Sequence, residues 1–292
     1  MTMNPSSQWL FKKSDLSQTP SVCDQTDKYT VERERIERAK GVSFILSVGF
    51  TLKLPQITLA TACVFFHRFY MRQSLSKYPY YDIAATCIFL ATKVEETGRK
   101  ISHIIVVCAQ KAQKNDKLTL PEGSPDYERW RNTILRNEQM LLEATCFDLT
   151  LEHPYKSLIN FTQESGVSKE ISQSAWGIVN DSLRFPFCLL FRSNLIAAAA
   201  VYLAHLLYPE DKSLKDGWWE SFNVTKHAAE DVANELLDQF AAYQAPISHN
   251  NEVKAEVEMS TPPGSSPLSA PTSPDKTKVE NGEANGGVPI AT

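Results

Sequence analysis

The chain has 292 residues, 42% of them hydrophobic, and a formal net charge of −4 at pH 7. This length suffices for two ordinary domains with tails, and the acidic balance argues against nucleic-acid binding through bulk charge. The opening residues lack the basic-then-apolar order of a secretory signal, and no run reaches the roughly 20 apolar residues that span a bilayer. We therefore expect a soluble intracellular protein that contacts neither nucleic acid nor membrane directly.

Five helical segments are predicted after a short N-terminal arm, residues 1–28. They cover about 31–52, a stretch beginning after Pro55, 80–96, 100–112 and 127–145. Proline just before a helix is a typical start signal. Because sustained period-two alternation of apolar residues is lacking, no sheet is expected.

A second set of helices is predicted at about 155–165, 168–184, 193–207, 217–222 and 225–243. Its third member contains AAAAVYLAHL (197–206), which matches AATCIFLATK (84–93) at an offset of 113 residues. Alanine-rich helices let neighbours approach closely, so both are expected at the centre of a helical unit. The sequence thus predicts an all-α chain of two similar five-helix units, 29–150 and 151–243.

The composition changes after about residue 244. Residues 244–292 are rich in Pro, Ser, Gly, Glu and Asn and hold almost no large apolar side chains. Such a segment cannot bury enough surface to offset the entropy of ordering it. We expect a disordered tail.

Charged side chains end the third predicted helix. Phe89, Lys93 and Glu96 fall at positions i, i+4 and i+7, on one face. A solvated helix end accounts for this pattern as well as a binding surface does, because lysine is favourable near a helix carboxyl end.

The fifth predicted helix carries an acid where an apolar residue is expected. Glu138 lies on the stripe formed by Trp130, Ile134 and Leu141. A lone carboxylate there is costly unless it is paired, and its partner is either internal, from Arg131 or Arg136, or another protein. Together with Lys93, this glutamate suits a surface that clamps the backbone of a partner protein.

No metal site, cofactor site or enzyme motif is found. The six cysteines form no C-x-x-C pair and stand mostly in apolar helical runs, as expected of buried reduced thiols. The histidines are scattered, and His67 and His205 lie in apolar stretches typical of structural histidines. Motifs for phosphate loops, nucleophile elbows and zinc proteases are missing, so the chain is expected to be non-catalytic.

These elements resemble the cyclins. The matching segments are SQWLFKKSDLSQTPSV (7–22), HRFYMRQS (67–74), FLATKVEET (89–97), ATCFDLTLEHPY (144–155), AWGIVNDSL (175–183) and WWESF (218–222). Within the family they are similar to the transcriptional cyclins T and K, most of all to a fungal cyclin of the P-TEFb type. The resemblance implies two tandem cyclin boxes.

The resemblance also implies a partner. In this family a lysine late in the third helix and a glutamate in the fifth contact the kinase, and they match Lys93 and Glu138. Phe89, Glu96 and Phe147 match further positions that face the kinase. The implied function is a regulatory subunit that forms a heterodimer with a cyclin-dependent kinase in the nucleus, activates it towards the RNA polymerase II C-terminal domain and promotes transcription elongation.

Several alternatives stay open. One is a cyclin K-like subunit of a separate polymerase C-terminal-domain kinase. Another is a TFIIB-like adaptor that activates no kinase, although such proteins usually carry a zinc ribbon and a basic surface. A third is a cyclin-like scaffold without kinase binding. The substrate-docking sequence MRAIL of cell-cycle cyclins is replaced here by AKGVSFIL, so docking of that type is not expected.

The tail contains three proline-directed sites, at Thr261, Ser266 and Ser273. Such sites occur in disordered segments of this composition by chance. Alternatively the bound kinase phosphorylates them, since Ser273-Pro-Asp-Lys resembles a cyclin-dependent kinase site. Each phosphate would add about −1.5 to −2 charges at pH 7.

Overall fold

The structure is a computed structural model that describes residues 8–24 and 29–244, which fall within one unit of the chain. In this part every regular element is helical, which confirms the all-α prediction. The main helices are α2 (Val31–Thr51), α3 (Gln56–Phe69), α4 (Tyr80–Val94), α5 (Ile101–Ala112), α6 (Pro125–Ala144), α7 (Pro154–Ser165), α8 (Lys169–Ser182), α10 (Ser193–Leu207) and α11 (Lys226–Gln244). The short elements are η2 (Lys13–Ser17), α1 (Pro20–Cys23), α9 (Phe187–Leu190) and η3 (Trp218–Phe222).

Local sequence signals set several helix starts. The side chain of Thr30 accepts a hydrogen bond from the backbone N–H of Arg33 and caps α2. Ser124 caps α6 in the same way, with Pro125 as the first helical residue. Because this cap lies before the proline, α6 begins two residues earlier than predicted.

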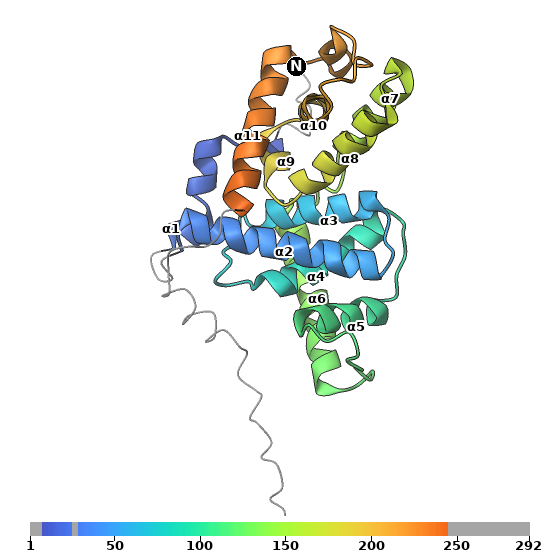
Figure 1. Ribbon diagram of the computed structural model, residues 1–292. Helices are drawn as coiled ribbons and strands as arrows, with labels where there is room; N and C mark the ends of the chain where they lie inside the picture. The colour runs from blue at the N-terminus through green and yellow to red at the C-terminus, as the bar shows by residue number, and fades with distance from the viewer. Residues whose placement is uncertain (1–7, 25–28, 245–292) are drawn as a thin grey trace, which may run out of the picture. The chain divides into compact units, whose positions relative to one another are not determined.

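Two helical groups are arranged around α4 and α10. In the first group, α2 to α6, the helix α4 packs against the other four. In the second group, α7 to α11, the helix α10 packs against α7, α8, α11 and η3. Figure 1 shows the first group in blue to green and the second in yellow-green to orange. The prediction that both alanine-rich helices are central is confirmed.

The second group departs from the first in its connections. Where a fourth helix was predicted at 217–222, the chain forms the short 3₁₀ helix η3. Gly217 precedes it at φ 78° and Asn223 follows it at φ 53°, so left-handed residues bound it on both sides. The four-residue helix α9 has no counterpart in the prediction.

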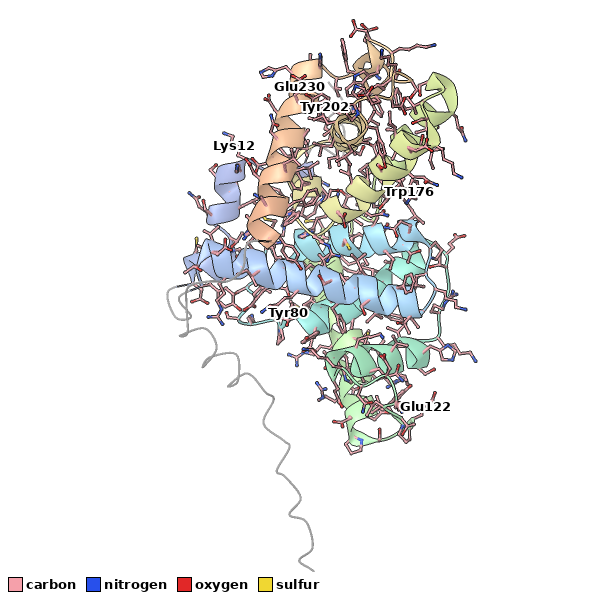
Figure 2. The ribbon with its side chains drawn as sticks, viewed as in Figure 1. Lys12, Tyr80, Glu122, Trp176, Tyr202 and Glu230 are labelled. Atoms are coloured by element: carbon pink, nitrogen blue, oxygen red, sulfur yellow. The ribbon has the colours of Figure 1, made fainter. Side chains whose placement is uncertain are left out.

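The two groups share one hydrophobic core. A cluster of buried side chains runs from Tyr29 on the first group to Ala229 on the second. A smaller cluster joins Phe185 and Phe187 to α10 and α11. On the same side, burial raises the pKa of Tyr202 of α10, and the neighbouring Glu230 of α11 raises it further (Figure 2). A boundary between boxes at residues 150 and 151 stays a prediction.

His67 is a structural residue at the contact between the groups. Its Nε2 lies 3.0 Å from the carbonyl oxygen of Leu183 and its side chain is fully buried. Burial, with the nearby Arg38 charge, lowers its pKa to about 3. The thiols of Cys63, Cys87 and Cys108 are also buried, as expected. Cys23 and Cys146 are exposed, which the prediction did not distinguish.

Candidate partner-binding surface

Lys93 and Glu138 meet across α4 and α6. Lys93 Nζ lies 2.6 Å from Glu138 Oε1, and the two side chains are 49% and 16% exposed. Neither Arg131 nor Arg136, the examples suggested for an internal partner, pairs with Glu138, and Arg131 Nη1 lies instead 3.8 Å from Glu128 on the same helix. The carboxylate next to the buried stripe is therefore compensated by a lysine from the neighbouring helix.

Phe89 supports the lysine. It lies one helical turn before Lys93 on α4, and the Lys93 ammonium lies 4.1 Å from the centroid of its ring. Its side chain is half-buried against the core of the first group. An ammonium over an aromatic face is attracted by the ring quadrupole, so Lys93 is held by two neighbours while about half of it faces solvent.

Glu96 lies outside the helix that was predicted to carry it. α4 ends at Val94, and Glu96 has the left-handed angle φ 51°. Its N–H bonds the carbonyl of Lys93, and the N–H of Thr97 bonds that of Thr92, the pair of hydrogen bonds that closes a Schellman motif. The i+7 placement of Glu96 on the Phe89 and Lys93 face was thus wrong, although the side chain is exposed just beyond that helix end.

Phe147 lies just after the end of α6 and is 65% exposed. α6 also closes with a Schellman pattern, from Cys146 N–H to Glu143 and from Phe147 N–H to Leu142. Cys146 and Phe147 are both left-handed, at φ 54° and 56°. A left-handed backbone is uncommon for an aromatic residue, and such a conformation persists only where the surrounding structure holds it in place.

Contacts in the structure join three of the five predicted site residues. Phe89, Lys93 and Glu138 form one connected cluster. Glu96 and Phe147 stand at the carboxyl ends of α4 and α6, helices that pack on each other. Within the described residues, neither side chain has a hydrogen bond or ion pair to the cluster.

Sequence reasoning missed a polar cluster at the N-terminal arm. Trp9 and Gln8 both donate hydrogen bonds to the carboxylate of Asp148, the residue after Phe147. Arg68 of α3 also contacts Asp148. The sequence signal was the short apolar run Trp9-Leu10-Phe11 in the arm, and nothing near it in the chain identifies the acceptor of the indole N–H.

Thr261, Ser266 and Ser273 lie outside the described residues. Among residues 8–24 and 29–244, no group of three or more His, Cys, Asp or Glu side chains could hold a metal ion. In the same ranges, no helix is long and apolar enough to cross a membrane.

Comparison with known proteins places the chain in a family. The family described as cyclin, N-terminal domain, matches residues 8–150. The chain is 48% identical to cyclin pch1 of Schizosaccharomyces pombe over 199 residues, covering 68% of this chain and 57% of that protein. It is 36% identical to cyclin-T1-4 of Arabidopsis thaliana over 256 residues, covering 85% and 47%, and 35% identical to human cyclin-K over 254 residues, covering 83% and 42%.

The fold is also similar to solved structures. A chain of the yeast RNA polymerase II CTD kinase CTDK-1 complex superimposes with a TM-score of 0.65 at 18% identity, covering 78% of this chain and 72% of that one. The chain spans about half the length of the curated relatives that it matches. The sequence match from the arm to the end of α6, with the all-helical fold, shows that the chain belongs to the cyclin family, in the group of the transcriptional cyclins T and K.

Proposed function

We propose that this chain is the regulatory subunit of a nuclear cyclin-dependent kinase that phosphorylates the C-terminal domain of RNA polymerase II. The observation that carries the proposal is the Lys93–Glu138 pair, which presents a half-exposed ammonium and a carboxylate together on the first group. The pair can exchange its internal contact for charge-assisted hydrogen bonds to a partner backbone. The chain would contribute no catalytic residue.

The mechanism is a shift of the kinase population. A subunit that binds only the active arrangement of a kinase stabilises that arrangement. In protein kinases the active arrangement needs the Lys–Glu ion pair of strand β3 and helix αC, together with the placed DFG aspartate. Phe89, Lys93 and Glu138 would bind this arrangement, and Glu96 and Phe147, at the neighbouring helix ends, would extend the interface.

A P-TEFb-type role in elongation is our finer proposal. It rests on the 48% identity to a fungal cyclin over 199 residues. A cyclin K-like role is the second candidate, because the chain is 36% identical to zebrafish cyclin-K over 251 residues. Both roles use the same surface, so identification of the co-purified kinase distinguishes them.

The test is a double substitution, Lys93→Ala with Glu138→Ala, followed by co-purification with the kinase and an assay on polymerase-repeat peptides. Loss of charged interface contacts of this kind costs about 2–5 kcal/mol, so affinity should fall by at least roughly thirtyfold. The matched control is Glu128→Ala with Arg131→Ala, an exposed pair on the same helix α6. Equal kinase recovery with both double variants would refute the interface, and a native chain that recovers no kinase would favour the adaptor interpretation.

A further inference from the structure

The side chain of Asp148 joins the N-terminal arm to the end of α6. Its Oδ2 accepts hydrogen bonds from Trp9 Nε1 at 2.9 Å and from Gln8 Nε2 at 2.6 Å. Arg68 lies on the other side, with Nη1 3.1 Å from the Asp148 carbonyl oxygen and 3.8 Å from Oδ2. This residue is therefore held through both its backbone and its side chain.

Trp9 is a buried anchor. Trp9 is 2% exposed, and the guanidinium carbons of Arg68 and Arg72 lie 4.5 and 5.2 Å from the centroid of its ring. Stacking against two guanidinium groups adds to the hydrogen bond from its indole. The tryptophan covers the arginine that holds the Asp148 backbone, so the three groups form a single contact.

The arm is also fastened to the second group. The N–H of Phe11 donates to the carbonyl oxygen of Leu189 at 2.7 Å, and Lys13 Nζ lies 2.6 Å from Glu235 Oε2. The two bonded residues, Phe11 and Lys13, follow Trp9 by two and four positions. The tryptophan is thus attached to a supported segment rather than to a free end.

The backbone before Asp148 needs such support. Cys146 occupies the left-handed position of the Schellman motif, which is usually glycine. Phe147 is left-handed as well, beyond what the motif requires, and left-handed backbone is disfavoured for residues with a side chain. A fixed Asp148 prevents the chain from relaxing out of this conformation.

We propose that Trp9 is a positioning residue, which through Asp148 holds Phe147 in the conformation that meets the kinase. This inference rests on the proposed function and adds the N-terminal arm to the binding machinery. The arm itself need not touch the kinase. It holds the backbone that carries the exposed ring in one conformation before binding, which lowers the ordering cost of association.

The first test uses the free full-length protein. Trp9→Phe keeps the stacked ring but removes the indole N–H, and Gln8→Ala removes the exposed second donor with little risk to folding. Lys12→Ala is the matched control, because Lys12 is an exposed residue of the same arm (Figure 2). We expect faster hydrogen exchange at the amides of 146–148 in the first two variants. In the control, the exchange rates of these amides should equal those of the unmodified protein. Unchanged exchange there would overturn the inference, whatever the kinase does.

The second test is a pair of double-mutant cycles for kinase affinity. A hydrogen bond to a charged group corresponds to a factor of about 10 to 150, so Trp9→Phe should lower kinase affinity by up to that factor. That decrease should largely vanish in a Phe147→Ala background and persist in a Lys93→Ala background. Equal decreases in both backgrounds would show a general structural role instead. Failure of the native chain to bind any kinase would refute the proposed function, while the exchange result would still decide the arm contact.

Discussion

The central helices of the two groups are alike in their interiors and different at their carboxyl ends. α4 and α10 bury alanines at corresponding positions, such as Ala91 and Ala204, both fully inaccessible. In its last turn α4 carries Lys93, paired to Glu138. The last turn of α10 carries Leu206 instead, which occupies the position of Lys93 in the repeat and is half-exposed.

This difference separates the fold from the function. The interior of each helix is constrained by close packing, which only small side chains allow. The exposed end is free to change, because a surface side chain contributes little to stability. The packed helical architecture therefore occurs in both groups, whereas the proposed binding surface occurs in the first group alone.

The largest effect on the unfolding free energy is expected when a buried ion pair in the first group is broken. Arg38 Nη2 lies 2.7 Å from Glu34 Oε1, with both side chains 4% exposed, and Arg38 also donates to the His67 carbonyl. Among the described residues, no ion pair of the second group is buried on both sides. Arg38→Ala leaves an uncompensated carboxylate and should lower the unfolding free energy by about 3–5 kcal/mol.

Urea denaturation measures this loss. The control is Lys226→Ala in the second group, where the exposed Lys226 has its Nζ 3.9 Å from the partly exposed Glu230 carboxylate. Removal of such a surface pair should change the unfolding free energy by less than about 1 kcal/mol. Similar midpoints for the two variants would mean that the buried pair contributes no more than a surface one.

The next effect tests whether the two interiors are equivalent. Ala91→Leu and Ala204→Leu insert the same volume at matching positions of α4 and α10. Overpacking of a filled core costs about 1–3 kcal/mol. Both variants should therefore lose a similar amount of unfolding free energy, measured by thermal denaturation. Ala241→Leu, exposed on α11, is the control and should change little. A large loss in one group alone would show that the repeats pack differently.

A pH-dependent effect is expected where the groups join. The pKa of His67 is lowered to about 3 in the folded chain, against an ordinary value of 6.5. Below pH 6.5 the unfolded chain takes up a proton that the folded chain cannot, so stability is complete above that pH and falls towards pH 3. The slope contributed by one such group is about 1.4 kcal/mol per pH unit.

His67→Gln should remove this contribution and flatten the pH profile of the unfolding free energy. Part of the slope should remain, since burial also lowers the pKa of His153, to about 4. The exposed His227, changed to Gln, provides the control. A profile unchanged in His67→Gln would mean that the ring is not held neutral at the contact with Leu183.

The interiors were predictable from the sequence and the helix ends were not. Apolar periodicity and alanine content predicted the long helices, because those patterns reflect burial along one element. The four-residue helices α1 and α9 carry no such pattern and form on contacts with distant segments. Glu96 takes a left-handed position where glycine is the usual signal, so its departure from α4 has no sequence cue.

The site was predictable residue by residue but not as an arrangement. Lys93 and Glu138 each attracted attention through their position on a helix. Their pairing depends on how α4 packs on α6, and 45 positions separate them in the chain. Trp9 and Asp148 are separated by 139 positions, and only the fold brings the arm to the end of α6.

The smallest effect concerns the exposed end of α10. Leu206→Lys places a lysine where α4 has Lys93. The substitution should change the unfolding free energy by less than about 1 kcal/mol, with a slight gain because a cation near a helix carboxyl end is favourable. It should not restore kinase recovery to Lys93→Ala, since a lysine alone lacks the partners that Phe89 and Glu138 supply on the first group. Restored recovery would mean that a lone lysine on either repeat suffices, and that the pair with Glu138 is dispensable.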